Sequence, residues 1–387
     1  MELPKKEQLY ELIKVNPFIS QQDLAVQLRL SRSAVAGHIA GLIRERRLLG
    51  RAYVLPGRRP IACIGAANLD RKLRSLATLT MGTSNPARQD ESFGGVARNI
   101  AENLARLGAP VALTTVIGDD ASGRALLAHA HAIGIDTSAS VTLPATCSGT
   151  YTAVLDEHGD MLVALADMGL YEALTPALLA EQNAHRTPAA LTVADLNLPI
   201  DTVATLLQEA ALGATPLVIV AVSQPKMARL PQDLRGLRLL ILNHGELETR
   251  IGAPIRADAD FAAACATVQA QGATDVIVTR GAGGLFYTLP GGGVAQMAAL
   301  GASVVDVTGA GDAFAAAVCW SLFDGSDDLE LACRRGLKLS SMTLECEETV
   351  CPWLGADSLD DIHNFGSAGG AMAPPAPPAQ FNALYQE

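Results

Sequence analysis

Between residues 60 and 360, short apolar runs alternate with longer stretches whose apolar residues recur at helical spacing. Runs that are apolar throughout are typical of strands buried on both faces, as in a mostly parallel sheet with helices on either side. This alternation predicts an α/β body in three layers. The expected strands are 61–65, 111–118, 190–194, 217–222, 239–242 and 276–279, and the expected helices are 96–107, 121–133, 201–212 and 258–271.

Two segments of the body interrupt this alternation. Residues 148–167 have the pattern of a β-hairpin, with a turn at residues 156–160, and residues 69–92 show no helical periodicity. Together they predict a small β lid on the main sheet.

The first 57 residues differ from the rest in charge and pattern. Residues 1–59 hold 11 Lys and Arg against 5 Asp and Glu, whereas the remainder holds 18 against 35, within a net charge of −11. Three helical patterns follow one another, with Ser20 and Ser31 as candidate N-caps of the second and third. A short turn at Arg29-Leu30 separates these two, which is helix-turn-helix spacing.

With a β-like tail at 48–55, this segment resembles the winged helix-turn-helix domain of bacterial regulators. The resemblance implies DNA binding, with the third helix as recognition helix and basic side chains on phosphates. The alternative is a three-helix appendage that mediates oligomerisation. The residues expected to contact DNA are Arg32, Ser33, His38, Arg44 and Arg47.

Composition limits the remaining possibilities. No apolar run reaches the ~18 residues that a membrane-spanning helix needs, and the N-terminus lacks the apolar stretch of a signal peptide. We therefore expect a cytoplasmic protein. Seven scattered cysteines without a C-x-x-C pair favour neither a disulfide framework nor a zinc site. The Gly/Ala/Pro-rich tail, residues 366–387, is expected to be disordered.

The segment from Asp306 to Phe314 carries the clearest chemical signal. Small residues at 309–311 end in Asp312, and an apolar run at helical spacing follows. The backbone N–H groups of Gly309, Ala310 and Gly311 would form an anion site where this helix begins. Asp312 would then lie beside a bound phosphate as a catalytic base, as a small-molecule kinase requires.

A second motif stands about 210 residues upstream. Gly94-Gly95 leads into a helix that contains Asn99, and Asn68 and Asp70 follow the first strand. Together with the 306–314 segment, this motif resembles the PfkB-type carbohydrate kinases of the ribokinase-like superfamily, over residues 60–355. The resemblance implies a three-layer α/β/α sandwich with a β lid, and substrate binding by Asn68, Asp70, Gly94, Gly95, Asn99 and Asp312.

The same resemblance implies ATP and Mg²⁺ as cofactors. Glu246 would hold Mg²⁺ through water, and Asp306 and Thr308 would bind a monovalent cation, with K⁺ as the candidate. Homodimers through the lid are also implied. The residues expected to line the nucleotide are Asn243, Glu246, Thr279, Arg280, Gly281 and Gly284.

One local signature bears on the acceptor. The segment from Thr83 to Pro86, ahead of Gly94-Gly95, is similar to pseudouridine kinases when taken with residues 98–104, 167–168 and 195–199. The resemblance implies phosphorylation of pseudouridine to pseudouridine 5′-phosphate. Ser84 and Asn85 would hydrogen-bond the uracil edge. Two alternatives stay open: a kinase for another sugar such as ribose, and a transcriptional regulator whose kinase-like body only senses a sugar or nucleoside.

Overall fold

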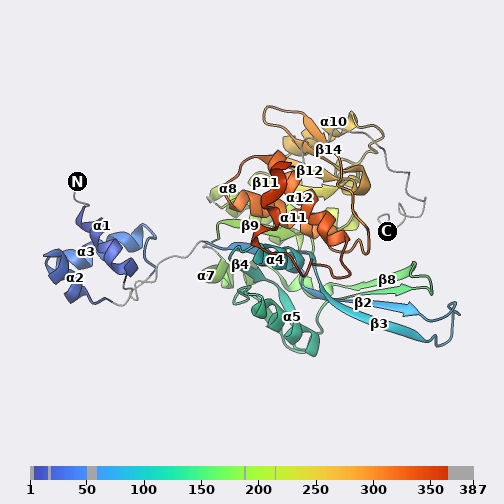
Figure 1. Ribbon diagram of the computed structural model, residues 1–387, viewed down its shortest axis with the longest axis horizontal. Helices are drawn as coiled ribbons and strands as arrows, with labels where there is room; N and C mark the ends of the chain where they lie inside the picture. Colours follow the sequence, from blue (N-terminus) through green and yellow to red (C-terminus); the bar gives the residue numbers. More distant parts are fainter. Residues whose placement is uncertain (1–3, 16–18, 50–58, 187–188, 214, 365–387) are drawn as a thin grey trace. The chain divides into compact units, whose positions relative to one another are not determined.

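The computed structural model describes residues 4–15, 19–49, 59–186, 189–213 and 215–364. The chain divides into two compact units, residues 1–59 and 60–387 (Figure 1). The expected wing at 48–55 falls mostly outside the described residues, and the tail at 366–387 falls wholly outside them. Within the described ranges, no helix has the length and apolar character to cross a membrane.

The N-terminal unit contains three helices, α1 (Lys5–Val15), α2 (Gln21–Leu28) and α3 (Arg32–Arg44). As expected, Ser20 and Ser31 cap α2 and α3, each accepting a hydrogen bond from a backbone N–H three residues on. Arg29 ends α2 in the left-handed conformation, so the chain turns sharply before α3 begins. The helices enclose a core of buried side chains, Leu9, Ile13, Leu24, Leu28, Val35, Ile39 and Leu42.

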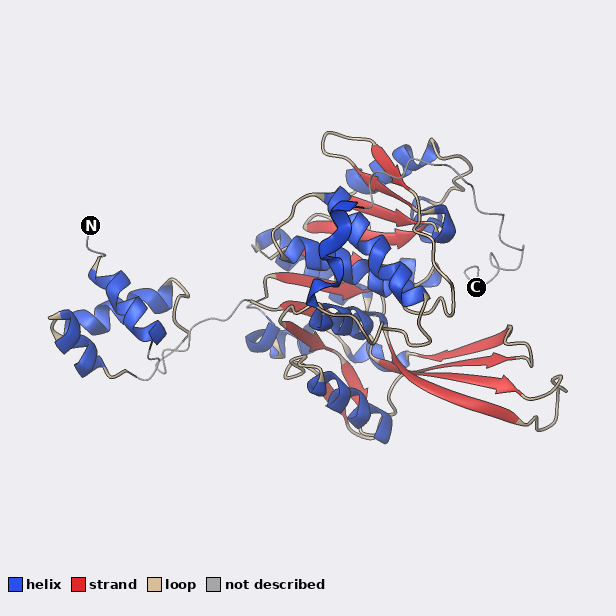
Figure 2. Ribbon diagram, viewed as in Figure 1, coloured by secondary structure: helices blue, strands red, loops and turns tan. Residues whose placement is uncertain are grey.

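An eight-stranded sheet with the order β14-β13-β12-β11-β10-β9-β1-β4 runs through the second unit (Figure 2). Its six strands from β12 to β4 are parallel, and β13 and β14 add an antiparallel edge. The strands are β1 (Ile61–Ile64), β4 (Val111–Thr114), β9 (Leu191–Asp195), β10 (Leu217–Val220), β11 (Leu237–Asn243), β12 (Asp275–Thr279), β13 (Leu285–Thr288) and β14 (Val294–Met297).

Helices cover both faces of this sheet, which confirms the three-layer α/β/α architecture. Successive strand residues alternate between two buried clusters: Ile64 packs with α8, α9 and α10, whereas Cys63 packs with α4, α11 and α12. These helices are α4 (Val96–Arg106), α8 (Ile200–Leu212), α9 (His244–Ile251), α10 (Asp260–Ala270), α11 (Ala310–Phe323) and α12 (Leu329–Leu344). The remaining helices are α5 (Ala121–Ala132), α6 (Pro176–Glu181), α7 (Asn183–Arg186) and four 3₁₀ segments, Gly169–Ala173, Pro225–Arg229, Gly281–Gly283 and Ala356–Asn364.

A separate four-stranded sheet, here called the lid sheet, projects from the body (Figure 2). Its order is β3-β2-β7-β8, with strands β2 (Asn68–Ser75), β3 (Ala87–Gly94), β7 (Thr150–Leu155) and β8 (Met161–Asp167). The two segments expected to form a lid thus pair within one sheet, β2 running parallel to β7 and antiparallel to β3.

The prediction of a single strand over 111–118 is wrong. The run breaks at Thr115 into β4 and β5 (Val116–Gly118), and β5 leaves the main sheet to pair with β6 (Val141–Leu143). The physical reason is local: the Thr115 N–H donates to the Ser140 hydroxyl (3.2 Å), and its carbonyl accepts from the Val141 N–H (2.9 Å). Apolar periodicity does not register such a change of partner.

Candidate active site

The expected site residues gather at one edge of the main sheet. Asp195, Asn243 and Thr279 lie at the carboxyl ends of β9, β11 and β12, and Asn68 starts β2 just beyond the carboxyl end of β1. Ligands of open α/β sheets bind at this edge. The N-terminus of α11 and that of α4 carry Asp312 and Asn99 to the same place, since these two side chains are hydrogen-bonded.

The backbone at position 309 accommodates only glycine. Gly309 precedes α11 with φ +82°, and a Cβ on it would collide with the Thr349 carbonyl. The first helical hydrogen bond runs from the Ala313 N–H to the Gly309 carbonyl (2.8 Å), so the N–H groups of Gly311 and Asp312 have no acceptor within the helix. Ala310 makes only a long contact with the Val307 carbonyl (3.4 Å). The turn therefore offers N–H groups at the positive end of α11.

Asp312, one turn into this helix, has the electrostatics of a base. Its Oδ2 accepts a hydrogen bond from Asn99 Nδ2 (2.7 Å). Removal from water raises its pKa to about 7, with further increases from the nearby charges of Asp195 and Asp70. A carboxyl group with a pKa near neutrality can both accept and release a proton during turnover.

Asp70 faces the same site from the lid sheet. Asn68 Nδ2 donates to its Oδ1 (2.6 Å), and burial raises the pKa of Asp70 to about 6. A Cβ on Gly94 would collide with the Asp70 carboxylate, and one on Gly95, at φ +98°, would collide with the Ala66 carbonyl. The glycine pair is therefore required by packing within the protein, beside any contact with a substrate.

Arg98 contacts the site residue Asn99, although the sequence analysis assigned it no role. It is 4% exposed and lies on α4 next to Asn99. It donates to the Phe93 carbonyl (2.8 Å) and to Asn99 Oδ1 (2.7 Å), and it forms an ion pair with the buried Glu102. Because Arg98 holds the oxygen of the Asn99 amide, the amide nitrogen is directed to Asp312. Arg98 does not stand out in the sequence, because the same helix also contains the charged residues Glu102 and Arg106.

Asp195 holds two parts of the site together and was likewise assigned no role in the sequence analysis. The carboxylate is buried, and its Oδ2 accepts from the N–H groups of Ala66 and Ala97, both at 2.9 Å, while Oδ1 accepts from the Asn197 N–H (2.8 Å). Burial raises its pKa, and these hydrogen bonds oppose the increase. The start of α4 is thereby fixed to the end of β1.

The residues expected around the nucleotide lie on neighbouring strands. Asn243 and Thr279 are register partners at the ends of β11 and β12. Asn243 and Glu246 cap α9 reciprocally, through Glu246 N–H to Asn243 Oδ1 (2.9 Å) and Asn243 N–H to Glu246 Oε2 (2.7 Å). Burial raises the pKa of Glu246 to about 7. The asparagine and the glutamate are therefore also structural.

The loop after β12, which is expected to line the nucleotide, also makes structural contacts within the protein. Gly281 and Gly284 have φ of +54° and +81°, and a Cβ on Gly284 would collide with the Met297 carbonyl. Arg280 donates to Asp258 Oδ1 (3.0 Å), and its guanidinium lies 5.3 Å from the centres of the Phe261 and Phe286 rings, which stack on each other. Its guanidinium is thus already engaged, and a role on ATP phosphates stays a prediction.

Asp306 and Thr308, expected to bind a monovalent cation, contact each other. Asp306 Oδ1 accepts from the Thr308 N–H (2.8 Å) and hydroxyl (2.6 Å). The second carboxylate oxygen forms an ion pair with Lys72 of β2. The described residues contain no group of three or more His, Cys, Asp or Glu side chains arranged to hold a metal ion.

Ser84 and Asn85 lie apart from these residues. The β2–β3 register pairs Asn68 with Gly94 at one end and Ser75 with Ala87 at the other. At about 3.3 Å per residue, the loop that holds Ser84 and Asn85 lies roughly 20 Å along the hairpin from Asn68. Asn85 bonds within that loop, to both backbone groups of Thr80 (2.8 and 3.0 Å). This arrangement does not place them near Asp312, and their substrate role stays a prediction.

In the N-terminal unit, Arg32, Ser33 and Arg44 are exposed on α3, and His38 is partly exposed. Arg47 differs from them. It forms a bidentate ion pair with Glu7 (2.7 and 2.8 Å) and lies 4.0 Å from the centre of the Tyr10 ring. Its side chain thereby ties the end of α3 to α1.

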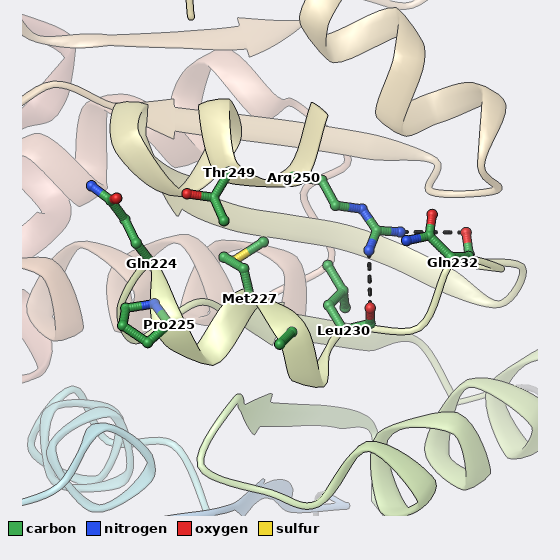
Figure 3. Close-up of a pocket in the computed structure, with 8 residues that line it drawn as sticks. Gln224, Pro225, Met227, Leu230, Gln232, Thr249 and Arg250 are labelled. Atoms are coloured by element: carbon green, nitrogen blue, oxygen red, sulfur yellow. Dashed lines mark hydrogen bonds between the residues drawn. The ribbon is translucent and has the colours of Figure 1, made fainter. Parts of the chain in front are cut away.

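A pocket of about 380 Å³ lies elsewhere, between the 3₁₀ segment Pro225–Arg229 and α9 (Figure 3). Arg250 spans it and donates to the carbonyls of Leu230 (2.9 Å) and Pro231 (2.7 Å). None of the residues expected to act on substrate lines this pocket. The grouping around Asp312, which combines a base and free N–H donors, is the better candidate for chemistry.

Comparison with known proteins agrees with this geometry. Residues 58–354 match the family described as pfkB family carbohydrate kinase. Two relatives come from Escherichia coli (strain K12). The uncharacterised sugar kinase YeiI is 32% identical over 83% of this chain and 88% of its own, and a pseudouridine kinase is 33% identical over 76% and 92%.

Solved structures show the same fold. Arabidopsis thaliana ribokinase, in complex with ribose and ATP, superposes with a TM-score of 0.70 at 20% identity, over 80% of this chain and all of that one. A sugar kinase structure from Clostridium perfringens gives a TM-score of 0.69 at 28% identity, over 80% and 96%. The chain therefore belongs to the pfkB family of carbohydrate kinases, enzymes that transfer a phosphoryl group to a hydroxyl acceptor.

Proposed function

We propose that this kinase transfers the γ-phosphoryl group of ATP to the primary hydroxyl of pseudouridine, forming pseudouridine 5′-phosphate. The observation that carries the proposal is the Asn99–Asp312 hydrogen bond, because it places a base with a pKa near 7 at the N-terminus of α11. The identity of 33% with a pseudouridine kinase along 92% of that protein supports the choice of acceptor.

In this mechanism Asp312 takes the proton of the acceptor hydroxyl as its oxygen attacks the γ-phosphorus in line. The N–H groups at Gly309–Gly311 donate to the transferring oxygens, where negative charge must be stabilised. Asn68 and Asp70 hold hydroxyls of the acceptor, and Asn99 keeps Asp312 oriented. The lid sheet closes over the acceptor and excludes water, which would otherwise accept the phosphoryl group.

ATP would lie along the loops that end β11 and β12, and Glu246 is the residue that would hold Mg²⁺. The ion prefers few protein carboxylates together with phosphate oxygens and several waters, so one glutamate fits it. Because Glu246 Oε2 already accepts the Asn243 N–H, contact through water suits this carboxylate. When bound, Mg²⁺ supplies positive charge to the phosphates.

The test is a panel of acceptors incubated with ATP and Mg²⁺, with ADP release measured and the product identified by mass. The panel includes pseudouridine, uridine, inosine and ribose. We expect kcat/KM for pseudouridine to exceed that of every other acceptor by at least about 100-fold, a ratio that hydrogen-bonding sites achieve. Preference for ribose or uridine would overturn the assignment of the acceptor.

A second candidate function concerns the N-terminal unit. We propose that α2 and α3 bind DNA, since they are joined by a sharp turn and α3 exposes Arg32 and Arg44. The kinase-like body would then report nucleoside occupancy to the DNA. Titration of genomic fragments with and without pseudouridine tests this. The variant Arg32→Ala should bind more weakly with a shallower salt dependence, and unchanged binding would contradict the proposal.

We also propose a homodimer through the lid sheet. Strand β8 leaves Leu162 and Leu165 exposed by 55% and 64%, next to the exposed Met161 and Val163. Strand β8 lies at the edge of the lid sheet, and an exposed apolar edge strand of this kind is covered by a partner in many proteins. Sedimentation velocity should give a dimer for the intact chain and a monomer for Leu165→Asp. A monomeric parent would refute it.

A further inference from the structure

The geometry around Asp306 disagrees with the monovalent cation that the family resemblance implies. Both oxygens of this carboxylate are engaged: Oδ1 accepts from the N–H and hydroxyl of Thr308, and Oδ2 binds the ammonium of Lys72. A K⁺ ion at the carboxylate would have to displace Lys72. The side chain of Asp306 is 22% exposed and that of Lys72 is 33% exposed, so the pair is partly shielded from water.

Lys72 comes from the strand that also supplies the substrate-binding carboxylate. Residues two apart on a strand point to the same face, so Lys72 and Asp70 share the face of β2 that looks toward the site. The charge of Lys72 also lowers the pKa of Asp70, against the larger increase caused by burial. The lysine is thus placed by β2 to reach Asp306 and the anion-binding turn.

The position of this ammonium suits the role of a bound cation. Asp306 and Thr308 stand just before Gly309 in the chain. An ammonium group bound to the Asp306 carboxylate therefore lies beside the N–H groups that would hold phosphate. Burial disfavours the charged form of Asp306, but hydrogen bonds from Lys72 and Thr308 hold its pKa below the ordinary value. A lysine ammonium is a compact charge with three donors.

We propose that the Lys72 ammonium replaces the monovalent cation in this kinase, so that its activity does not depend on K⁺. The lysine then acts as a positioning residue that fixes the Asp306–Thr308 segment and, through it, the turn at Gly309–Gly311. It also joins the lid sheet to that turn. This inference rests on the proposed phosphate site at the turn.

The experiment compares the intact chain with Lys72→Met in choline chloride, NaCl and KCl at equal ionic strength. The parent should keep the same kcat/KM in all three salts, within about twofold. The variant should lose at least about tenfold in choline chloride, which corresponds to ~1.4 kcal/mol of barrier, and regain most of it at about 0.1 M KCl. In Lys72→Met with Asp306→Asn, KCl should no longer restore activity.

Arg71→Met is the matched control, because Arg71 is the neighbouring basic residue on β2 and pairs with Glu91 (2.8 Å) instead. It should stay insensitive to the salt. A parent that KCl activates tenfold, or a Lys72→Met variant that KCl does not restore, would overturn the inference.

Thermal unfolding provides a readout that needs no turnover and so separates this inference from the choice of acceptor. KCl should raise the melting temperature of Lys72→Met relative to choline chloride and leave that of the parent unchanged. Equal responses of the two proteins would also overturn the inference.

Discussion

The substitution Asp312→Asn should stabilise the protein while removing its activity. Asp312 has a pKa of about 7 in the folded chain against an ordinary value of 3.8. Folding therefore disfavours the charged carboxylate, and this cost develops between pH ~4 and ~7 and is complete above pH ~7. At 1.36 kcal/mol per pH unit the shift corresponds to about 4 kcal/mol, which we reduce to about 2 kcal/mol because Asp312 is only partly buried.

The replacement keeps the shape of the side chain, and its amide oxygen can still accept from Asn99. We therefore expect the melting temperature to rise by about 4 °C at pH ~8 and by much less at pH ~5. The kcat should fall at least about 100-fold, the usual contribution of a general base. Asp90→Asn, at an exposed aspartate on β3, should change neither quantity.

Thermal unfolding at the two pH values, together with steady-state kinetics, checks both halves of this prediction. A variant that melts below the parent at pH ~8 would show that the environment does not disfavour the charge of Asp312. A variant that retains near-normal turnover would show that Asp312 is not the base.

Three further substitutions follow from the same geometry. Gly309→Ala should cost at least about 1–3 kcal/mol of unfolding free energy, because the residue has a positive φ and faces the Thr349 carbonyl; chemical denaturation measures this, and unchanged stability would contradict it. Arg98→Met removes a buried charge that lowers the pKa of Asp312, so the acid limb of the kcat/KM profile should move to higher pH. Because the buried Glu102 loses this ion pair, stability should also fall by about 3–5 kcal/mol. An acid limb that does not move would argue against coupling between Arg98 and Asp312. Glu246→Gln keeps an acceptor for the Asn243 N–H and removes a carboxyl group whose pKa burial raises to about 7, so stability at pH ~8 should not fall. The Mg²⁺ concentration for half-maximal rate should rise at least about tenfold; an unchanged Mg²⁺ titration would remove Glu246 from the metal site.

The architecture of the body was predictable from sequence because its strands are short and apolar throughout. Where the chain changes partners, that signal fails. Residues 111–113 and 116–117 are apolar, which favours one continuous strand. The Thr115 N–H nevertheless donates to the Ser140 hydroxyl, and the strand divides there. The pattern of apolar residues reports which residues are buried, and β4 and β5 are both buried. It does not report which strand each of them pairs with.

The candidate site was predictable as far as local motifs reach. The turn at Gly309–Asp312 and the glycine pair at 94–95 each carry a signal within a few residues. Arg98 and Asp195 act across the fold, through Asn99 and through the backbone of Ala66 and Ala97, and only the tertiary structure brings these partners together. The Lys72–Asp306 pair joins positions 234 residues apart and leaves no local pattern.

The pH dependence of kcat/KM for the acceptor tests the central claim most directly, since it reports the ionisation of the base in the free enzyme. With Asp312 as that base, kcat/KM should be constant above pH ~7.5 and fall tenfold per pH unit below an apparent pKa of about 7. The residual activity of Asp312→Asn should lack this limb. A parent profile that stays flat down to pH ~5, under conditions where the protein remains folded, would contradict the assignment of Asp312 as the group that activates the hydroxyl.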